Sequence, residues 1–142
     1  AGHVAYYGPG LLFCGDTLFS AGCGRLLEGT PAQMYRSLRR LAALPTRTQV
    51  YAAHEYTVEN LRFACSLLPA DSRLARALEN AVTIRADAQA TLPTTIGRER
   101  EINLFLRVDE PELRAAIAER TGGSLPAHQE AFAALRRLKD SF

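Results

Sequence analysis

Two residues of kinds that bind metal ions each follow a short apolar segment of the sequence. Asp16 comes shortly after segment 11–14, and His54 comes directly after segment 50–53. If both segments are strands of one sheet, both side chains lie at the same end of it, which is where α/β folds bind ligands. A carboxylate and a neutral imidazole are both good ligands for a zinc-like cation. Because two ligands do not hold a catalytic metal alone, this pair predicts part of a metal site.

Each of these residues also has a structural explanation, and the residue types alone leave both explanations open. Asp16 can close a turn by accepting hydrogen bonds from nearby backbone N–H groups. His54 can be a partly buried histidine that hydrogen-bonds to the backbone at the end of a strand. The neighbouring Glu55 can orient a metal ligand or form a surface ion pair.

Composition excludes several classes of protein. An apolar content of 47% and a charged content of 23% are typical of a soluble globular protein. The net charge of +2 comes from dispersed basic residues, which gives no case for a nucleic-acid partner. No apolar run approaches the ~20 residues that cross a membrane. The chain carries neither an initiating methionine nor a signal peptide, so we expect a truncated start.

Three cysteines are odd in number and do not have the spacing of a disulfide framework or a zinc finger. Cys14 lies in an apolar run and is expected to be a buried hydrophobe. Cys23 lies in the glycine-rich segment 19–29, which we expect to be a loop, and a catalytic thiol there is the less favoured alternative. Unpaired thiols suit a reducing cytoplasm.

Strands and one helix must bring Asp16 and His54 together. Segments 4–7 and 11–14 are separated by Gly-Pro-Gly, which predicts a hairpin with a tight turn. Segment 49–53 predicts a further short strand, which ends at His54. Between them, Thr30 can begin a helix with a capping box completed by Gln33.

The second half of the sequence predicts mainly helices. We expect helices over residues 57–68, 71–90, 109–120 and 127–139 and an extended loop over 91–107. Thr57, Asp71 and Asp109 are the expected N-caps of the first three of these helices. The order of strands, helix, strand and then helices predicts an α+β fold with a boundary near residues 56–70.

Several long strings also carry a family resemblance. They are G-D-T-L-F-x-A-G-C-G-R at 15–25, E-G-T at 28–30, H-E-Y-T-x-x-N-L-x-F-A at 54–64, N-L-F-L-R at 103–107 and R-R-L-K-D-S-F at 136–142. In this order they resemble the second half of glyoxalase II, the hydroxyacylglutathione hydrolase family of the metallo-β-lactamase superfamily. The opening A-G-H-V-A-Y-Y resembles the strand after that family's G-H-T-x-G-H turn.

The resemblance implies the fold and the extent of the chain. Residues 1–56 would form the second half of an αββα metallo-β-lactamase sandwich, and residues 57–142 an all-helical substrate-binding domain. The family's main metal motif, T-H-x-H-x-D-H, is absent. We therefore expect a C-terminal portion that is inactive alone. We also expect a monomer when the protein is complete, whereas the chain alone should pair through its exposed sheet.

The resemblance also implies an activity. The family hydrolyses S-D-lactoylglutathione and related 2-hydroxyacylglutathione thioesters to glutathione and D-lactate, in methylglyoxal detoxification. Two divalent metal ions take part, with zinc as the default and iron or manganese as alternatives. By the resemblance, Asp16 would bridge the two ions and His54 would be a terminal ligand of the second. His3 would orient the strand or the metal site rather than bind metal.

By the same resemblance, a glutathione thioester would contact Arg25, Tyr56, Arg136 and Lys139. Arginine binds a carboxylate in a bidentate manner and lysine acts as a point charge, which suits the two carboxylates of glutathione. For each basic residue the alternative is a solvated side chain. Relatives often have a tyrosine where this chain has Leu27, so one hydrogen-bond donor is absent.

Two other functions are kept as alternatives. A mononuclear iron enzyme of the persulfide dioxygenase type shares a similar glycine-rich stretch, but the H-E-Y-T string and the helical C-terminus argue against it. A non-catalytic glutathione-binding or interaction module is the second alternative.

His128, near the start of the last predicted helix, is expected to be exposed or to cap that helix.

Overall fold

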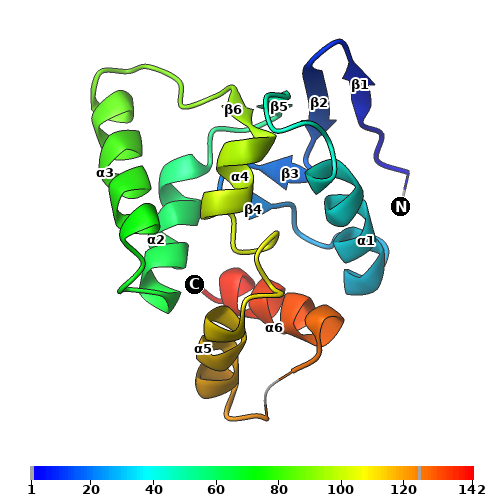
Figure 1. Ribbon diagram of the computed structural model, residues 1–142, viewed down its shortest axis with the longest axis vertical. Helices are drawn as coiled ribbons and strands as arrows, with labels where there is room; N and C mark the ends of the chain where they lie inside the picture. Colours follow the sequence, from blue (N-terminus) through cyan, green and yellow to red (C-terminus); the bar gives the residue numbers. More distant parts are fainter. Residues whose placement is uncertain (1, 125) are drawn as a thin grey trace.

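The computed structural model describes residues 2–124 and 126–142, so Ala1 of the opening motif lies outside the described residues. Its strands are β1 (Tyr6–Gly8), β2 (Leu11–Gly15), β3 (Leu18–Phe19), β4 (Gly22–Cys23), β5 (Gln49–Ala52) and β6 (Thr94–Thr95). Its helices are α1 (Pro31–Ala42), α2 (Thr57–Leu67), α3 (Ser72–Ala86), α4 (Ile96–Ile102), α5 (Pro111–Thr121) and α6 (His128–Asp140). The mixture of short strands and helices confirms the α+β class (Figure 1).

The main sheet has the strand order β1-β2-β5-β6. β1 and β2 form the expected antiparallel hairpin, with Tyr6 opposite Phe13. β2 and β5 are parallel, with Leu12 opposite Val50. Because parallel strands end at the same edge of a sheet, the residues that follow β2 and β5 lie at one edge, as the sequence predicted. β3 and β4 form a separate two-stranded pair.

The two faces of the main sheet differ in exposure. Leu12, Cys14 and Val50 point to one face and are completely buried. Phe13, on the opposite face, is 50% exposed and stacks on Tyr51 at a ring distance of 5.0 Å. Parallel strands are usually covered on both faces. A sheet face that the described residues leave open is therefore unusual. Pairing of copies through it stays a prediction.

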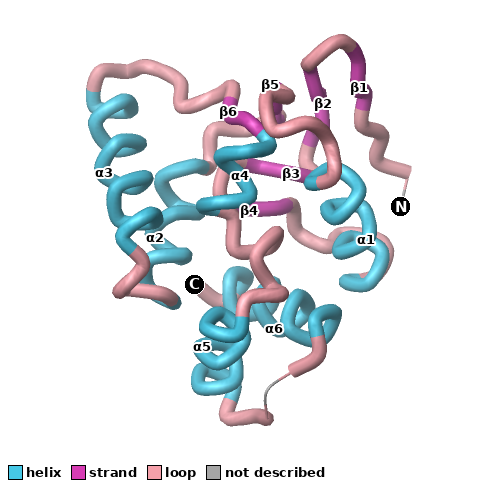
Figure 2. The backbone as a smooth tube through the Cα atoms, in the orientation of Figure 1, coloured by secondary structure: helices cyan, strands magenta, loops and turns pink. Residues whose placement is uncertain are grey.

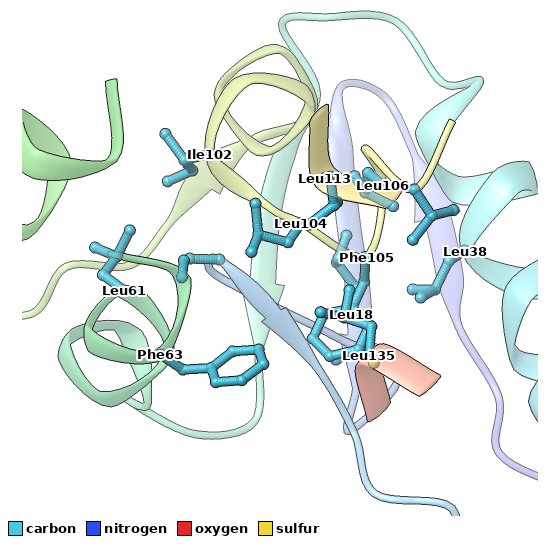
Figure 3. Close-up of a cluster of buried hydrophobic side chains, with 14 of the residues drawn as sticks. Leu18, Leu38, Leu61, Phe63, Ile102, Leu104, Phe105, Leu106, Leu113 and Leu135 are labelled. Atoms are coloured by element: carbon cyan, nitrogen blue, oxygen red, sulfur yellow. The ribbon is translucent and has the colours of Figure 1, made fainter. Parts of the chain in front are cut away.

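One core joins the strands to the helices (Figure 3). Leu18 from β3, Leu61 from α2 and Leu135 from α6 belong to the same buried cluster as Phe105 from the loop after α4. Figure 2 shows the strands gathered at one end of the molecule and α5 and α6 at the other. β6, although it lies late in the sequence, pairs with β5 and completes the sheet. The boundary between residues 56 and 57 stays a prediction.

Local sequence signals set the start of two helices as expected. Thr30 caps α1: its Oγ1 accepts the N–H of Gln33 at 3.2 Å, and the Gln33 side chain accepts the N–H of Thr30 at 2.8 Å. Asp71 caps α3 by accepting the N–H of Arg73 at 2.9 Å. These caps satisfy backbone donors that have no partner within the helix.

Two other N-cap predictions were wrong. Tyr56 precedes α2 as its N-cap, and Thr57 is the first helical residue, whose hydroxyl donates to Glu55. Glu110 is the N-cap of α5, because Pro111 after it occupies the first helical position. Asp109 instead accepts a hydrogen bond from Arg39 of α1.

The expected extended loop over 91–107 was also wrong, because it contains β6 and α4. The buried residues of α4 are Ile96, Glu99 and Ile102, so an acidic residue occupies the middle of its buried face. An acidic residue at a buried position interrupts the apolar periodicity from which an amphipathic helix is predicted. α3 ends at Ala86, earlier than predicted, and Ala88 beyond it adopts a positive φ of 56°.

Candidate functional site

A pocket of about 630 Å³ opens at the edge of the sheet where β2 and β5 end. Its walls also come from β4, the start of α2 and the end of α6. All of the residues that the sequence suggested for metal and substrate line this pocket: Asp16, Arg25, His54, Tyr56, Arg136 and Lys139. The structure therefore brings them together, and their individual roles stay predictions.

Asp16 and His54 face one another at the sheet edge. Asp16 Oδ1 lies 3.3 Å from His54 Nε2, and each side chain is about half exposed (52% and 51%). The backbone N–H of Asp16 donates to His3 Nε2 at 2.8 Å, and Asp16 lines the pocket. This hydrogen bond supports the expected orienting role of His3, which stays a prediction.

The spacing of these two atoms suits a shared metal ion. Zinc–oxygen and zinc–nitrogen bonds of about 2.0–2.1 Å in tetrahedral geometry separate two ligand atoms by roughly 3.3 Å. Among residues 2–124 and 126–142, no group of three or more His, Cys, Asp or Glu side chains is placed to hold a metal. The pair is thus a fitting but incomplete ligand set.

Aromatic rings fix the orientation of His54. The Tyr56 ring stacks on the His54 ring at 5.1 Å with an interplanar angle of 19°. Phe19 meets Tyr56 edge-on at 5.1 Å and lies 6.0 Å from the His54 ring. Phe19 is buried and lines the pocket, so its ring supports both of the others. Sequence reasoning missed Phe19 in this role, because an apolar residue beside a predicted metal ligand is usually part of the core.

Glu55 forms hydrogen bonds rather than an ion pair among the described residues, and its role in orienting a metal ligand stays a prediction. Its carboxylate accepts hydrogen bonds from the Thr57 hydroxyl at 3.0 Å and from the Thr91 N–H at 2.8 Å. Burial alone would raise the pKa of Glu55, but the hydrogen bonds from Thr91 and Thr57 lower it below its usual value. Glu55 therefore ties the segment before β6 to the turn that carries His54.

At the opposite end of the pocket, Arg136 is buried and already paired. One of its terminal nitrogens donates to the Cys23 carbonyl at 2.8 Å, and the other lies 3.0 Å from Asp140 Oδ1. Its guanidinium also lies over the Phe105 ring at 5.1 Å. Nε of Arg136 is buried and has no hydrogen-bond partner among the described residues. The side chain anchors β4 to α6 and lines the pocket with positive charge.

Lys139 and Arg25 are more accessible than Arg136. Lys139 Nζ lies over the rings of Phe63 and Phe142, at 5.4 and 5.3 Å, and donates to the Glu59 carbonyl at 3.4 Å. Burial and the charge of Arg136 lower the pKa of Lys139. Arg25 is 75% exposed, and its Nε lies 3.8 Å from Asp140 Oδ1. Both cations remain able to bind an anionic ligand.

Three other sequence predictions have clear outcomes. Cys23 lies in β4 rather than in a loop, and burial raises the pKa of its thiol to about 12, which excludes a thiolate nucleophile at neutral pH. Leu27 is 90% exposed at the rim of the pocket. His128 is half-exposed and pairs with Asp109 at the start of α6, away from the pocket.

Acidic residues at the basic end were missed by the sequence reasoning. Asp140 pairs with Arg136 one helical turn earlier and approaches Arg25. The spacing of four residues between Arg136 and Asp140 is a signal that could have found this pair, because such residues are neighbours on a helix surface. Asp140 keeps two of the cations in place between the β4 segment and α6.

Comparisons with known proteins identify the family of the chain. A family model described as Hydroxyacylglutathione hydrolase C-terminus matches residues 55–142, and one described as Metallo-beta-lactamase superfamily matches residues 1–54. The hydroxyacylglutathione hydrolase of Photobacterium profundum is 50% identical over 141 residues, which are 99% of this chain and 55% of that protein. That of Chromohalobacter salexigens is 55% identical over 143 residues, which are 99% of this chain and 55% of that protein. The chain thus spans about half the length of the curated relatives it matches.

Proposed function

Because this chain belongs to the hydroxyacylglutathione hydrolase family of the metallo-β-lactamase superfamily, we propose that it takes part in the hydrolysis of S-D-lactoylglutathione. The products are glutathione and D-lactate, and related 2-hydroxyacylglutathione thioesters are further substrates. The supporting observation is one pocket lined both by the adjacent Asp16 and His54 side chains and by the cations Arg25, Arg136 and Lys139. The family names do not favour the persulfide dioxygenase alternative.

Membership of the metallo-β-lactamase superfamily implies metal ions. We propose two divalent ions, with zinc as the metal, held in part by Asp16 and His54. The 3.3 Å separation of Asp16 Oδ1 and His54 Nε2 supports this assignment. Further ligands would come from the rest of the full-length protein. When bound, the ions would supply a Lewis acid and lower the pKa of water to about 7.

The remaining residues of the pocket would bind and orient the substrate. Glutathione carries a carboxylate at each end of the tripeptide, and Arg25 and Lys139 are the accessible cations that suit them. Arg136 would keep the Cys23 segment in place rather than bind the ligand with its whole guanidinium. Tyr56, stacked on His54, would hold the acyl end near the metal ligands. Glutathione leaves as a thiolate, so little help from a general acid is needed.

Two further proposals concern the setting of this reaction. We place it in methylglyoxal detoxification, because lactoylglutathione is a product of that chemistry. We place it in the cytoplasm, because Cys14, Cys23 and Cys65 are all free thiols. Among the described residues, none of the helices has the length and apolar character needed to cross a bilayer.

The test is an assay of thioester hydrolysis with S-D-lactoylglutathione. The full-length protein that contains this sequence is loaded with zinc and compared with the 142-residue chain. We expect rapid release of glutathione from the full-length protein and none above background from the chain alone. Absence of hydrolysis by the full-length protein, combined with tight binding of glutathione, would support the non-catalytic binding module instead.

A further inference from the structure

Glu99 is a buried carboxylate without a cationic partner among the described residues. It is completely buried in the middle of α4. Its Oε1 accepts hydrogen bonds from the hydroxyls of Ser20 at 2.9 Å and Thr94 at 2.8 Å. Its Oε2 accepts from the N–H of Ala21 at 2.8 Å and from Asn103 Nδ2 at 3.0 Å. An unpaired buried charge is costly unless it is fully hydrogen-bonded, and here each oxygen has two donors.

Two of these donors belong to the turn between β3 and β4, residues 19–22. The turn has little support from its own backbone, since β3 and β4 are only two residues long each. Ala21 adopts a positive φ of 56°, which is unfavourable for a residue with a Cβ atom. Its N–H is directed at Glu99, so the carboxylate stabilises the strained conformation.

Neighbouring side chains complete the hold on this turn. Asn103 Nδ2 donates to the carbonyls of Phe19 at 3.1 Å and Gly22 at 2.9 Å. Asn60 Nδ2 donates to the Ser20 carbonyl at 3.0 Å, and a Cβ on Gly22 would lie only 2.5 Å from that nitrogen. The turn is therefore shaped by the side chains of Asn60 in α2, Glu99 in α4 and Asn103, the residue that follows α4.

The turn leads directly to the pocket on both sides. On one side is Phe19, whose ring supports Tyr56 and His54. On the other side is Cys23, whose carbonyl accepts the hydrogen bond of Arg136. A shift of the turn would thus disturb both ends of the pocket.

We infer that Glu99 is a positioning residue of the candidate site, which holds the 19–22 turn from α4 and so fixes Phe19 against Tyr56 and His54. Glu99 does not line the pocket, so it acts through the turn and not on a ligand. The effect on turnover rests on the proposed function, whereas the effect on the rings of the pocket does not.

The surroundings of Glu99 suggest a conservative variant. The Ser20 and Thr94 hydroxyls can either donate or accept, whereas the Ala21 N–H and the Asn103 amide nitrogen can only donate. In Glu99→Gln, the amide nitrogen can therefore donate to the Ser20 and Thr94 hydroxyls, while the amide oxygen keeps the hydrogen bonds from the Ala21 N–H and Asn103 Nδ2. Burial raises the pKa of Glu99 and the four donors oppose this shift. Removal of the charge in the glutamine variant should accordingly be tolerated.

The experiment compares Glu99→Ala and Glu99→Gln in the 142-residue chain by NMR of the aromatic rings. We expect the Phe19, Tyr56 and His54 resonances to shift in Glu99→Ala and to stay close to the wild type in Glu99→Gln. Asp71→Asn is the matched control: the Asp71 side chain is only 6% exposed, but it binds Arg73 and Arg107 outside the pocket. This control should lose stability without shifting the three rings.

Should Glu99→Ala fail to fold, Thr94→Val removes one hydrogen bond of Glu99 with little change of shape, and smaller shifts of the same rings are expected. Unchanged rings in the folded Glu99 or Thr94 variants, or equal shifts in Asp71→Asn, would overturn the inference. In the full-length protein, Glu99→Ala should lower kcat/KM roughly tenfold to a hundredfold, with recovery in Glu99→Gln. Shifted rings in a protein without hydrolase activity would refute the proposed function and leave the positioning role intact.

Discussion

The two ends of the pocket are built in opposite ways. At the sheet edge, the side chains of Asp16 and His54 are half exposed and direct their ligand atoms toward one another. At the α6 end, Arg136 is buried and bound to a carbonyl, a carboxylate and a ring, and Lys139 lies between two phenylalanines. The Asp16 and His54 side chains are accessible to an added ion, whereas the Arg136 guanidinium is already bound to other groups of the protein.

Asp16 and His54 contribute mainly to the candidate site, whereas Arg136 contributes both to the site and to the stability of the fold. In the proposed function, Asp16 and His54 would need an added ion to complete their site, so a substitution there should affect metal binding and leave the fold intact. Arg136 contributes to the fold as well as to the pocket, so a loss there should affect stability first. Four substitutions test this contrast, from the largest expected effect to the smallest.

Asp16→Ala in the zinc-loaded full-length protein should give the largest effect, with loss of the two-metal centre and of hydrolysis. One carboxylate would serve both ions, so its removal affects both. Metal content per chain after dialysis measures this outcome, and the exposed Asp87→Ala serves as a control. If the Asp16 variant kept two tightly bound ions, Asp16 would not be a metal ligand.

Arg136→Met should lower the free energy of unfolding by about 2–3 kcal/mol, because it leaves the Cys23 carbonyl and Asp140 without their donor. Denaturant unfolding of the 142-residue chain measures the change. Arg137→Met changes the next residue on the exposed side of α6 and should stay within about 0.5 kcal/mol. Equal effects of the two variants would show that the basic end is no more structural than the surface.

Lys139→Ala should raise KM for the thioester about tenfold with much less change in kcat, because a remote carboxylate is bound equally in the ground and transition states. Steady-state kinetics of the full-length protein give both constants. Lys139→Arg, which keeps the charge, is the control and should stay closer to the wild type. An unchanged KM in the alanine variant would remove Lys139 from the substrate site.

Leu27→Tyr should give the smallest effect, a decrease in KM of about threefold, as expected for one exposed hydrogen bond. Leu27 is 90% exposed at the rim, so stability should not change. Leu27→Phe adds the ring without the hydroxyl and separates the hydrogen bond from apolar contact. An equal gain in both variants would assign the effect to the ring.

Local signals predicted much of the fold. The Thr30 capping box and the Asp71 cap depend on residues a few positions apart, and both are present. The placement of Asp16 and His54 at one edge followed from two short apolar strands. The α4 helix escaped prediction because its central buried residue is Glu99, whose partners Ser20 and Ala21 are 79 and 78 positions away.

The basic end shows the same limit for the site. Arg136 was predicted as a substrate residue because of its motif, and it does line the pocket. Its bond to Cys23, 113 positions away, could not be seen from residue spacing. The sequence therefore predicted which charged residues line the pocket. Only the structure shows which of them already form hydrogen bonds or ion pairs within the protein.

The hold on the 19–22 turn has a consequence for exchanging parts between relatives. The two family models meet between residues 54 and 55, yet the turn lies before that point while the Asn60, Glu99 and Asn103 side chains that shape it lie after it. A chimaera joined at the model boundary would combine a turn from one protein with supports from another. A stable chimaera should therefore take the turn and its three supporting side chains from the same parent.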